Sequence, residues 1–211
     1  MRIAVIGAGA MGSALARRLA AAGHSVVIGS RDAGRARALA AETGAAPAES
    51  YAEAASASEV VVLTVPWRAV RQVVPALPLD GKILVDATNP YVDDTFDGGE
   101  PIWSAREEFP PGASGASVIQ ALAPATRVVK AWNHVWARAA ERGLGDARPA
   151  VFVCGDDPDA RAVVASLARD SGYDPHDAGG LEQARWLEAL TPLVIALGDS
   201  TYSLTMTRTP G

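Results

Sequence analysis

Short apolar runs rich in β-branched residues alternate along the chain with longer stretches rich in alanine. The runs contain few polar positions, a pattern typical of strands that are covered on both faces. They predict six strands and a further one near residues 173–175. The six lie at residues 3–6, 26–28, 60–64, 83–86, 128–130 and 151–154.

The alanine-rich stretches between these runs predict helices. Strands that alternate with helices are typical of a parallel sheet built from crossover connections. The sequence therefore predicts an α/β fold in one domain, residues 1–211, with a doubly wound, mostly parallel sheet and helices on both faces. The helices are expected at residues 11–22, 34–42, 49–57, 67–76, 115–122, 158–170 and 181–197.

Two stretches interrupt the alternation. Residues 91–114 combine glycine, proline and acidic residues, and they predict a long loop of the kind that is usually functional or mobile in a compact domain. The last eleven residues show no clear helical period. They are compatible with a strand, a subunit contact or a frayed tail.

Composition narrows the range of partners. The chain has 19 Lys and Arg against 24 Asp and Glu, and its basic residues are scattered, which disfavours a nucleic-acid partner. No apolar run approaches the roughly 18 residues that span a membrane. The single Cys154 cannot form an internal disulfide. We therefore expect a soluble, cytoplasmic protein.

The sequence GAGAMG, which begins at Gly7, fits the pattern G-x-G-x-x-G directly after a predicted strand and before a predicted helix. Gly7 permits the tight turn, Gly9 lets the backbone approach a pyrophosphate, and Gly12 lets the helix pack on the strand. The N–H groups of Ala10, Met11 and Gly12 would face the anion with the helix dipole behind them. The motif predicts a dinucleotide site in a Rossmann-like domain, and the alternative is a tight turn that binds nothing.

Ser30 and Arg31 follow the second predicted strand, where a site for NAD carries Asp or Glu on the ribose hydroxyls. An acid there would repel the 2′-phosphate of NADP. Arg31, and Arg35 one helical turn further on, can instead form charge-assisted hydrogen bonds with it. Asp32 could be a displaced ribose acid, but its neighbours favour a helix N-cap. We therefore predict NADP rather than NAD as the cofactor.

Trp67 and Asn89 follow the ends of two further strands, in the segments LTVPWRAV and VDATNPYV. Doubly wound folds hold their ligands at the carboxyl ends of their strands. Pro66 and Pro90 end these strands and stiffen the backbone. Trp67 offers a flat apolar face and Asn89 an amide where a nicotinamide is expected. The alternatives are a core tryptophan and ordinary loop chemistry.

Three other reactive side chains give no sign of a catalytic or metal site. His134 has neither metal-ligand spacing nor a Ser-His-Asp set around it, so it is expected as a surface or hydrogen-bonding residue. Lys130 is expected as a solvated or loop-packing lysine, and Cys154 as a buried strand residue. Hydride transfer between two bound rings needs mainly proximity, so an oxidoreductase needs no conspicuous acid or base.

The segments GSRD, LTVPW, DATNP, VFVCGDD and DAGGLEQARWLEALTPL follow the glycine motif in this order. With them, the chain resembles the NADPH-dependent F420 reductase family over nearly its whole length. The segment VKAWNHV also looks like part of the reductase domain of six-transmembrane metalloreductases. The resemblance implies a dimeric Rossmann-like protein that passes a hydride between NADP(H) and the deazaflavin coenzyme F420, without a catalytic side chain.

The resemblance also implies site residues. For the pyrophosphate and the 2′-phosphate it points to the same residues as the motifs above. It adds Tyr91 and Ala137 to Trp67 around the nicotinamide. It places the deazaflavin close to Pro90, Asn133 and His134.

Two other kinds of function remain open. The chain could use NADPH to reduce a different acceptor, such as a flavin, a ferric chelate or an imine. It could also be a redox sensor that binds NADPH without turnover and reports it to a partner protein. The expected ligands are therefore NADP(H) and a small redox co-substrate, with a second copy of the chain as partner.

Overall fold

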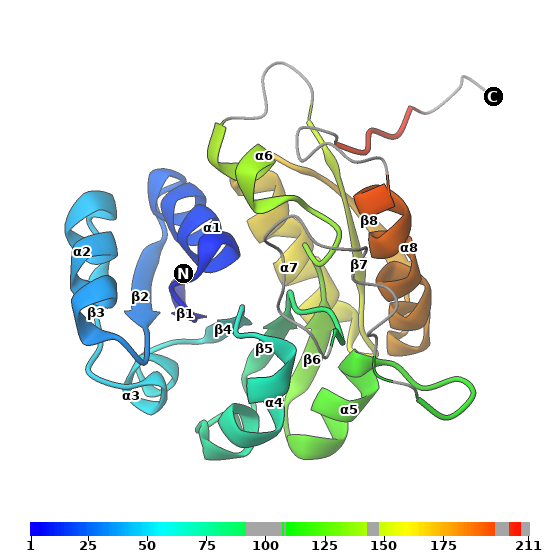
Figure 1. Ribbon diagram of the computed structural model, residues 1–211, viewed down its shortest axis with the longest axis horizontal. Helices are drawn as coiled ribbons and strands as arrows, with labels where there is room; N and C mark the ends of the chain where they lie inside the picture. Colours follow the sequence, from blue (N-terminus) through cyan, green and yellow to red (C-terminus); the bar gives the residue numbers. More distant parts are fainter. Residues whose placement is uncertain (92–106, 108, 143–147, 197–202, 208–211) are drawn as a thin grey trace.

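A computed structural model describes residues 1–91, 107, 109–142, 148–196 and 203–207. Its strands form one sheet in the order β3-β2-β1-β4-β5-β6-β7-β8 (Figure 1). The strand bounds are β1 Arg2–Ile6, β2 Ser25–Gly29, β3 Ala46–Pro47, β4 Val60–Leu63, β5 Ile83–Asp86, β6 Arg127–Lys130, β7 Ala150–Cys154 and β8 Asp174–Gly179.

The strands from β3 to β6 in this order all pair in parallel. Strand β7 then pairs antiparallel with β6, through Lys130 and Cys154, and β8 pairs in parallel with β7. The sheet is therefore mostly parallel, as predicted, with its last two strands reversed. Helix α6 (Ala137–Arg142), which the sequence did not predict, lies between β6 and β7.

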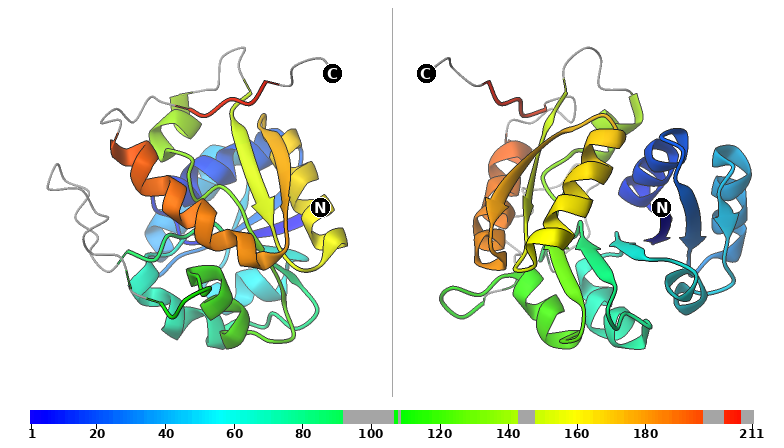
Figure 2. Two further views of the ribbon diagram at one scale, coloured as in Figure 1. Left: turned by 90° about the vertical axis from the view of Figure 1, so that its right-hand side faces the viewer. Right: turned by 180° about the vertical axis from the view of Figure 1, so that it is seen from behind.

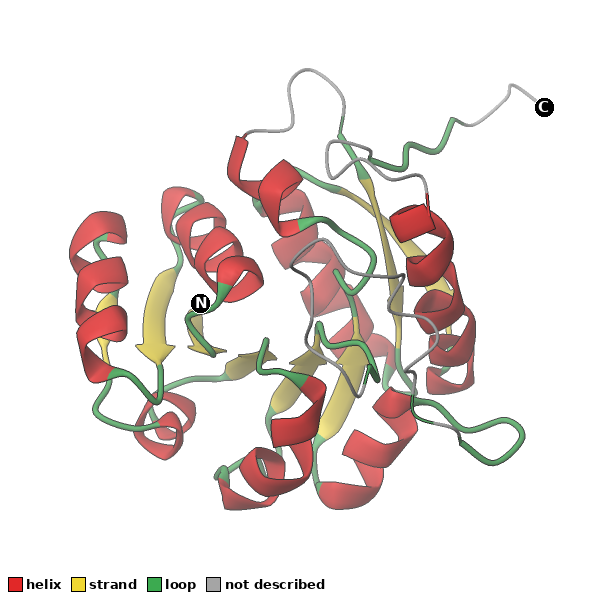
Figure 3. Cartoon of the chain, viewed as in Figure 1, coloured by secondary structure: helices red, strands yellow, loops and turns green. Residues whose placement is uncertain are grey.

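Helices cover both faces of the sheet, as the fold class requires (Figure 3). Alternate strand residues point into two separate cores: Ile3 and Val5 lie in one, and Ala4 and Ile6 in the other. The first core is covered by α1 (Ala10–Ala21), α2 (Ala33–Thr43) and α7 (Pro158–Asp170). The second is covered by α3 (Tyr51–Ser56), α4 (Trp67–Val73), α5 (Gly115–Leu122) and α8 (Ala184–Ala196). The predicted α/β fold is confirmed.

Local capping explains which helices the sequence predicts with correct bounds. Ser114 accepts from the backbone N–H of Ser117 and starts α5, and Asp157 caps α7 ahead of Pro158.

Two predicted helices are interrupted. The stretch 67–76 divides into α4 and a 3-10 turn, η1 (Val74–Ala76), and the stretch 181–197 begins with a 3-10 turn, η3 (Leu181–Gln183).

Two other predictions fall partly outside the described residues. In the loop at 91–114, residues 92–106 and 108 are not described. At the end of the chain, residues 203–207 are described and are irregular, so they do not form the strand considered above. The carbonyl of Leu204 accepts a hydrogen bond, at 2.6 Å, from the backbone N–H of Ala150, the first residue of β7.

Candidate functional site: a pocket at the ends of the parallel strands

A pocket of about 720 Å³ lies at the carboxyl ends of β1, β2, β4 and β5. Parallel strands place their carboxyl ends along one edge, so segments distant in sequence meet there. Five segments line the pocket: residues 7–11, residues 30–32 with Arg35, Tyr51, residues 64–67, and residues 87–89 with Tyr91. Its volume is of the size that holds a small ligand or cofactor.

The glycine turn forms one wall of this pocket. Gly7 has φ +114°, a conformation that L side chains rarely adopt, and a Cβ on Gly12 would lie 1.9 Å from the carbonyl oxygen of Gly7. Helix α1 starts from Gly9 without a side-chain cap and without an acid in its first turn. Its N-terminal N–H groups are therefore left for an anion.

Thr64, at the end of β4, holds this turn in place. Its hydroxyl oxygen Oγ1 lies 3.0 Å from the carbonyl oxygens of both Ile6 and Gly7, to which it donates. The sequence reading placed Thr64 only as the end of a strand and missed this contact. Its position, directly across from the glycine motif on the neighbouring strand, is the signal that could have found it.

Replacing Gly12 by Ala should destabilise the protein, because the added Cβ overlaps a backbone oxygen that cannot move without distorting the turn. We expect the free energy of unfolding to fall by about 3 kcal/mol, as for a strongly overpacked core position. Urea denaturation measures it. Gly9→Ala is the matched control, since a Cβ there meets nothing within 4 Å; equal losses in the two variants would contradict this account of the turn.

The predicted 2′-phosphate residues lie together at the end of β2. Ser30 Oγ accepts from the backbone N–H of Asp32 at 3.2 Å, and Asp32 Oδ1 accepts from that of Arg35 at 3.1 Å. Asp32 is thus the N-cap of α2, as predicted, and its carboxylate is engaged there. Arg31 and Arg35 are exposed and line the pocket. Within the described residues, neither guanidinium is paired with a carboxylate.

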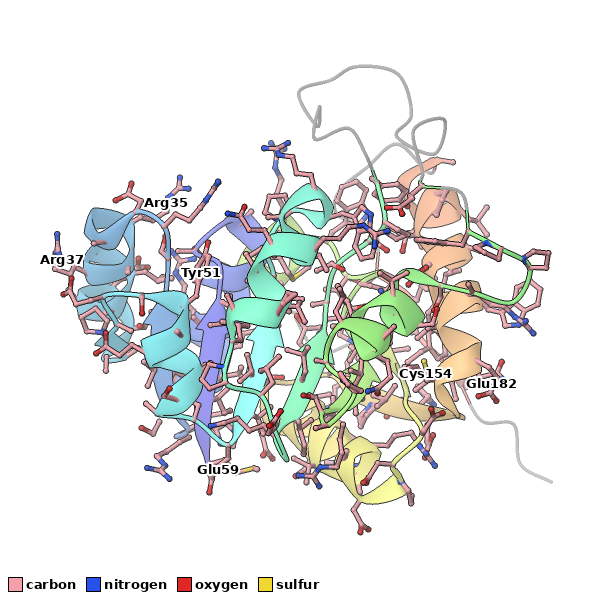
Figure 4. The ribbon with its side chains drawn as sticks, turned by 90° about the horizontal axis from the view of Figure 1, so that it is seen from below. Arg35, Arg37, Tyr51, Glu59, Cys154 and Glu182 are labelled. Carbon is pink, nitrogen blue, oxygen red and sulfur yellow. The ribbon has the colours of Figure 1, made fainter. Side chains whose placement is uncertain are left out.

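Tyr51 lies at this same end of the pocket and was missed by the sequence reading. It is the first residue of α3, and a Cβ on Gly29 would come within 3.2 Å of its ring. Gly29, a glycine at the end of a strand, was the available signal, because such a glycine often marks a close approach. Figure 4 shows Tyr51 and Arg35 on neighbouring elements, with Arg37 on the outer side of α2.

Trp67 and Tyr91 form the apolar part of the pocket. Trp67 is the first residue of α4 and is only 5% exposed; its Nε1 donates to Glu107, and its ring meets Phe109 edge-on at 6.1 Å. Trp67 is therefore both a core residue and a pocket-lining residue. Tyr91 is 6% exposed and lines the same pocket.

Asn89 stands beside them and is held by residues from two other elements. Its Nδ2 donates to the carbonyl of Asn133 at 2.7 Å, and its Oδ1 accepts from Asn133 Nδ2 and Thr191 Oγ1, both at 3.1 Å. Thr191 is on the inner face of α8, 102 residues away in sequence. The amide of Asn89 is therefore fixed before any ligand binds.

Ten of the predicted site residues line the one pocket, and Gly12 lies directly behind its glycine turn. The ten are Gly7, Gly9, Ala10, Met11, Ser30, Arg31, Arg35, Trp67, Asn89 and Tyr91. The lining does not include Ala137, at the start of α6, nor the predicted deazaflavin residues. Of these, Pro90, Asn133 and His134 are all buried. The roles assigned to these side chains stay predictions.

His134 is buried next to this region and is held neutral. Its Nε2 donates to the carbonyl of Ala150 at 3.2 Å, and its ring packs against Phe152 with centroids 5.2 Å apart. Burial lowers the pKa of His134 to about 4; the Ala150 hydrogen bond opposes this shift and the Lys130 charge adds to it. His134 is thus a hydrogen-bonding residue, one of the two roles expected for it.

The lowered pKa of His134 makes stability depend on pH. The unfolded chain binds this proton below its ordinary pKa of 6.5, whereas the folded chain resists it down to about 4. The contribution is therefore complete above pH 6.5 and is lost as the pH falls towards 4. In the wild type, proton uptake by His134 should lower the free energy of unfolding by about 3 kcal/mol between pH 6.5 and pH 4. His134→Gln should abolish this decrease. Urea denaturation at a series of pH values measures the free energy of unfolding of both proteins. If that free energy falls equally with pH in the variant and the wild type, the role of His134 is refuted.

A fully buried charge cluster lies behind the wall formed by residues 87–89. Lys130 Nζ is 2.8 Å from Asp86 Oδ2 and 3.0 Å from Glu188 Oε1, and it donates to the carbonyl of Thr88 at 2.8 Å. All three charged side chains are fully buried. The alternative of a solvated Lys130 was wrong: Lys130 meets the loop after β5 through the carbonyl of Thr88, but its two buried ion pairs were not predicted.

The carboxylates of this cluster are also satisfied by backbone groups. Asp86 Oδ1 accepts from the N–H and the hydroxyl of Thr88, and Glu188 accepts from the N–H groups of Gly115 and Ala116 at the start of α5. Burial by itself lowers the pKa of Lys130, but the charges of Asp86 and Glu188 outweigh it and raise that pKa. Lys130 is therefore an ammonium group and a structural cation.

The described residues contain no group of three or more His, Cys, Asp or Glu side chains that could hold a metal ion. They also contain no helix of the length and apolarity needed to cross a bilayer. The thiol of Cys154 is buried, and burial raises its pKa to about 12, so it is a poor nucleophile.

Comparison with known proteins gives a consistent set of relatives. A family model described as NADP oxidoreductase coenzyme F420-dependent matches residues 2–90. The F420-dependent NADP reductase of Methanothermobacter marburgensis is 36% identical, over 93% of this chain and 92% of its own length. Rat metalloreductase STEAP3 is 33% identical over 93% of this chain, which spans 39% of that longer protein.

Solved structures agree with these sequence relatives. A crystal structure from Arthrobacter sp. FB24, described as that of a "putative F420 dependent NADP-reductase", superposes with a TM-score of 0.81. The two chains are 31% identical, and the match covers 98% of this chain and 99% of that one. The likeness therefore extends over the sheet, the pocket and α8 together.

Proposed function

We infer that this chain, which belongs to the family of F420-dependent NADP reductases, transfers a hydride between NADP(H) and coenzyme F420. One observation carries the cofactor half of this proposal. Two exposed arginines, Arg31 and Arg35, line the pocket at the end of β2, and Asp32, the one acid among the described residues that line it, caps a helix. That arrangement suits the 2′-phosphate that distinguishes NADP from NAD.

The pocket residues fit the rest of NADP. We propose that the pyrophosphate lies on the N–H groups of residues 9–12, because Gly9 leaves room for it and α1 has no side-chain cap. The 2′-phosphate would lie on Ser30, Arg31 and Arg35. The nicotinamide would lie towards Trp67, Asn89, Tyr91 and Ala137.

The protein's part in the reaction is positioning. The two ring cofactors supply the hydride chemistry when both are bound. Trp67 and Tyr91 give a largely buried aromatic wall, and Asn89 gives a fixed amide beside it. The second ring is proposed close to Pro90, with Asn133 and His134 behind it, and none of these side chains needs to take a proton. His134 stays neutral at physiological pH because its pKa is about 4.

The test of this function is a panel of acceptors. The protein is mixed with NADPH and, in separate reactions, with F420, FMN or a ferric chelate, and NADPH oxidation is followed by absorbance. Turnover with F420 alone supports the proposal. Turnover with the ferric chelate instead would favour an activity of the kind named for STEAP3, the relative that suggests this second candidate. Saturable NADPH binding without turnover would favour a redox sensor.

We also propose that the protein is a cytoplasmic homodimer that uses the outer face of α8. Trp186 and Leu193 are 59% and 64% exposed, and Ala189 between them is exposed too. These residues lie at helical spacing on one face, and α8 lies at the surface in the left view of Figure 2. Light scattering should give a dimer for the wild type and a monomer for Leu193→Lys; a monomeric wild type would contradict the proposal.

A further inference from the structure

Backbone carbonyls determine how the amide of Asn133 is oriented. Its Nδ2 donates to the carbonyl of Leu187 on α8 at 2.9 Å, and a carbonyl can only accept. The nitrogen of Asn133 therefore faces α8, where it also lies 3.1 Å from Asn89 Oδ1. Because a nitrogen donor meets that atom, the oxygen end of the Asn89 amide faces the protein.

Two further contacts establish the orientation of the Asn89 amide independently. Its Nδ2 lies 2.7 Å from the backbone carbonyl of Asn133, which again only accepts. The hydroxyl of Thr191 donates to Asn89 Oδ1 at 3.1 Å. The two observations agree, so the oxygen and the nitrogen of this amide cannot be exchanged without losing contacts at both ends.

Counting the hydrogen-bonding capacity of Asn89 leaves one group unused. A side-chain amide has two acceptor positions and two N–H donors. Asn133 Nδ2, which also lies 3.1 Å from Thr191 Oγ1, and the Thr191 hydroxyl are the two donors that face the Asn89 oxygen, and the carbonyl of Asn133 takes one N–H. Asn89 is half-buried and lines the pocket. The one polar group that it can still offer to a ligand is the second N–H of Nδ2.

The backbone next to Asn133 is strained in a way that supports this arrangement. Trp132 has φ +59°, a left-handed conformation that is a true outlier for a bulky residue, although its side chain is fully buried. Such strain persists only where the surroundings hold it, and it often accompanies functional sites. The residue that follows it, Asn133, meets Asn89 with both its side chain and its carbonyl.

We propose that Asn89 donates this N–H to a carbonyl oxygen on a ring bound in the pocket, and that Asn133 and Thr191 are positioning residues that fix it as a donor. The inference rests on the proposed function, because the ring is either the nicotinamide, through its carboxamide, or the second ring, through a ring carbonyl. A ligand with a donor at that point would meet a donor and be rejected.

The test compares NADP with thio-NADP, whose carboxamide oxygen is replaced by sulfur, a weaker acceptor. Dissociation constants are measured for the wild type, Asn89→Leu, Thr191→Val and Thr191→Ser, together with the KM for F420. The valine variant keeps the shape of Thr191 and loses its hydroxyl, whereas the serine variant keeps the hydroxyl. Thermal melting checks that each variant is folded, and if Asn89→Leu is not, the Thr191 pair decides.

If the nicotinamide is the ring, the wild type should prefer NADP to thio-NADP by about three- to tenfold. The ratio of the dissociation constants for thio-NADP and NADP should approach one in Asn89→Leu, fall in Thr191→Val and stay at the wild-type value in Thr191→Ser. If the second ring is the partner, the ratio stays constant, and the KM for F420 rises by about three- to tenfold in the first two variants but not in Thr191→Ser. A merely structural role would weaken both nucleotides equally and leave the ratio unchanged.

Two results would overturn the inference. If Asn89→Leu changes neither the ratio nor the KM for F420, no ligand accepts from Asn89. If Thr191→Val and Thr191→Ser behave alike, Thr191 does not position it through its hydroxyl. Both results can occur in a protein that turns over NADPH and F420, so they overturn this inference alone, whereas a wild type that does not bind NADP would overturn the proposed function with it.

Discussion

Arg31→Glu is expected to weaken NADPH binding by roughly a hundredfold and to change NADH binding by less than about threefold. Arg31 lines the pocket and no described carboxylate is paired with it, so its charge is available to a ligand. The substitution removes charge-assisted hydrogen bonds to the 2′-phosphate and places a like charge beside it. NADH lacks that phosphate and loses nothing comparable. Isothermal titration with both nucleotides measures the difference.

The control for Arg31 is Arg37→Glu. Arg37 carries the same charge on α2, the helix that follows Arg31, but it is not part of the pocket lining and lies 4.0 Å from Glu49, with its side chain 60% exposed. This variant makes the same change in net charge, so it reports any general electrostatic effect. NADPH binding should change little. Equal weakening of NADPH and NADH by Arg31→Glu would refute the role proposed for Arg31.

Lys130→Met should destabilise the protein by about 3–5 kcal/mol, the largest effect on stability that we expect. The substitution keeps the apolar stem but leaves Asp86 and Glu188 fully buried without their cation, and it removes the donor to Thr88. Two buried carboxylates would then repel each other or take up protons. Urea denaturation at neutral pH measures the loss.

Lys82→Met is the matched control for this cluster. Lys82 Nζ also contacts three oxygens, but all three are backbone carbonyls, so its removal leaves no buried carboxylate. It should cost clearly less than Lys130→Met. Adding Asp86→Asn to Lys130→Met should recover part of the stability, because it removes one of the two uncompensated charges while the amide oxygen can still accept from Thr88. Equal losses at Lys130 and Lys82, or no recovery, would contradict the charge argument.

The features that the sequence predicts well depend on neighbours in the chain. Strand β5 and helices α5 and α7 have the predicted bounds because apolar runs and caps such as Ser114 and Asp157 act over a few residues. The glycine motif and Arg31 are also predictable from neighbouring residues, because each lies where a strand, a turn and a helix follow one another directly in the sequence. The resemblance to a family added the second substrate, which no local pattern indicated.

The missed features depend on residues far apart in the sequence. Lys130 meets Asp86 and Glu188 across 44 and 58 residues, and only the folded sheet with α8 against it shows that these charges compensate one another. Thr191 reaches Asn89 across 102 residues for the same reason. Strand β3 has only two residues, Ala46 and Pro47, too few for a periodic signal.

The most direct test of hydride transfer uses NADPH that carries deuterium at C4 of the nicotinamide. The protein is incubated with this NADPH and oxidised F420, with each of the two C4 epimers in turn, and the reduced deazaflavin is analysed by mass spectrometry. The account predicts that one epimer delivers its deuterium to the deazaflavin, because direct hydride transfer requires one face of the nicotinamide to lie against the second ring. Reduced F420 without deuterium from either epimer, or no reduction at all, would contradict it.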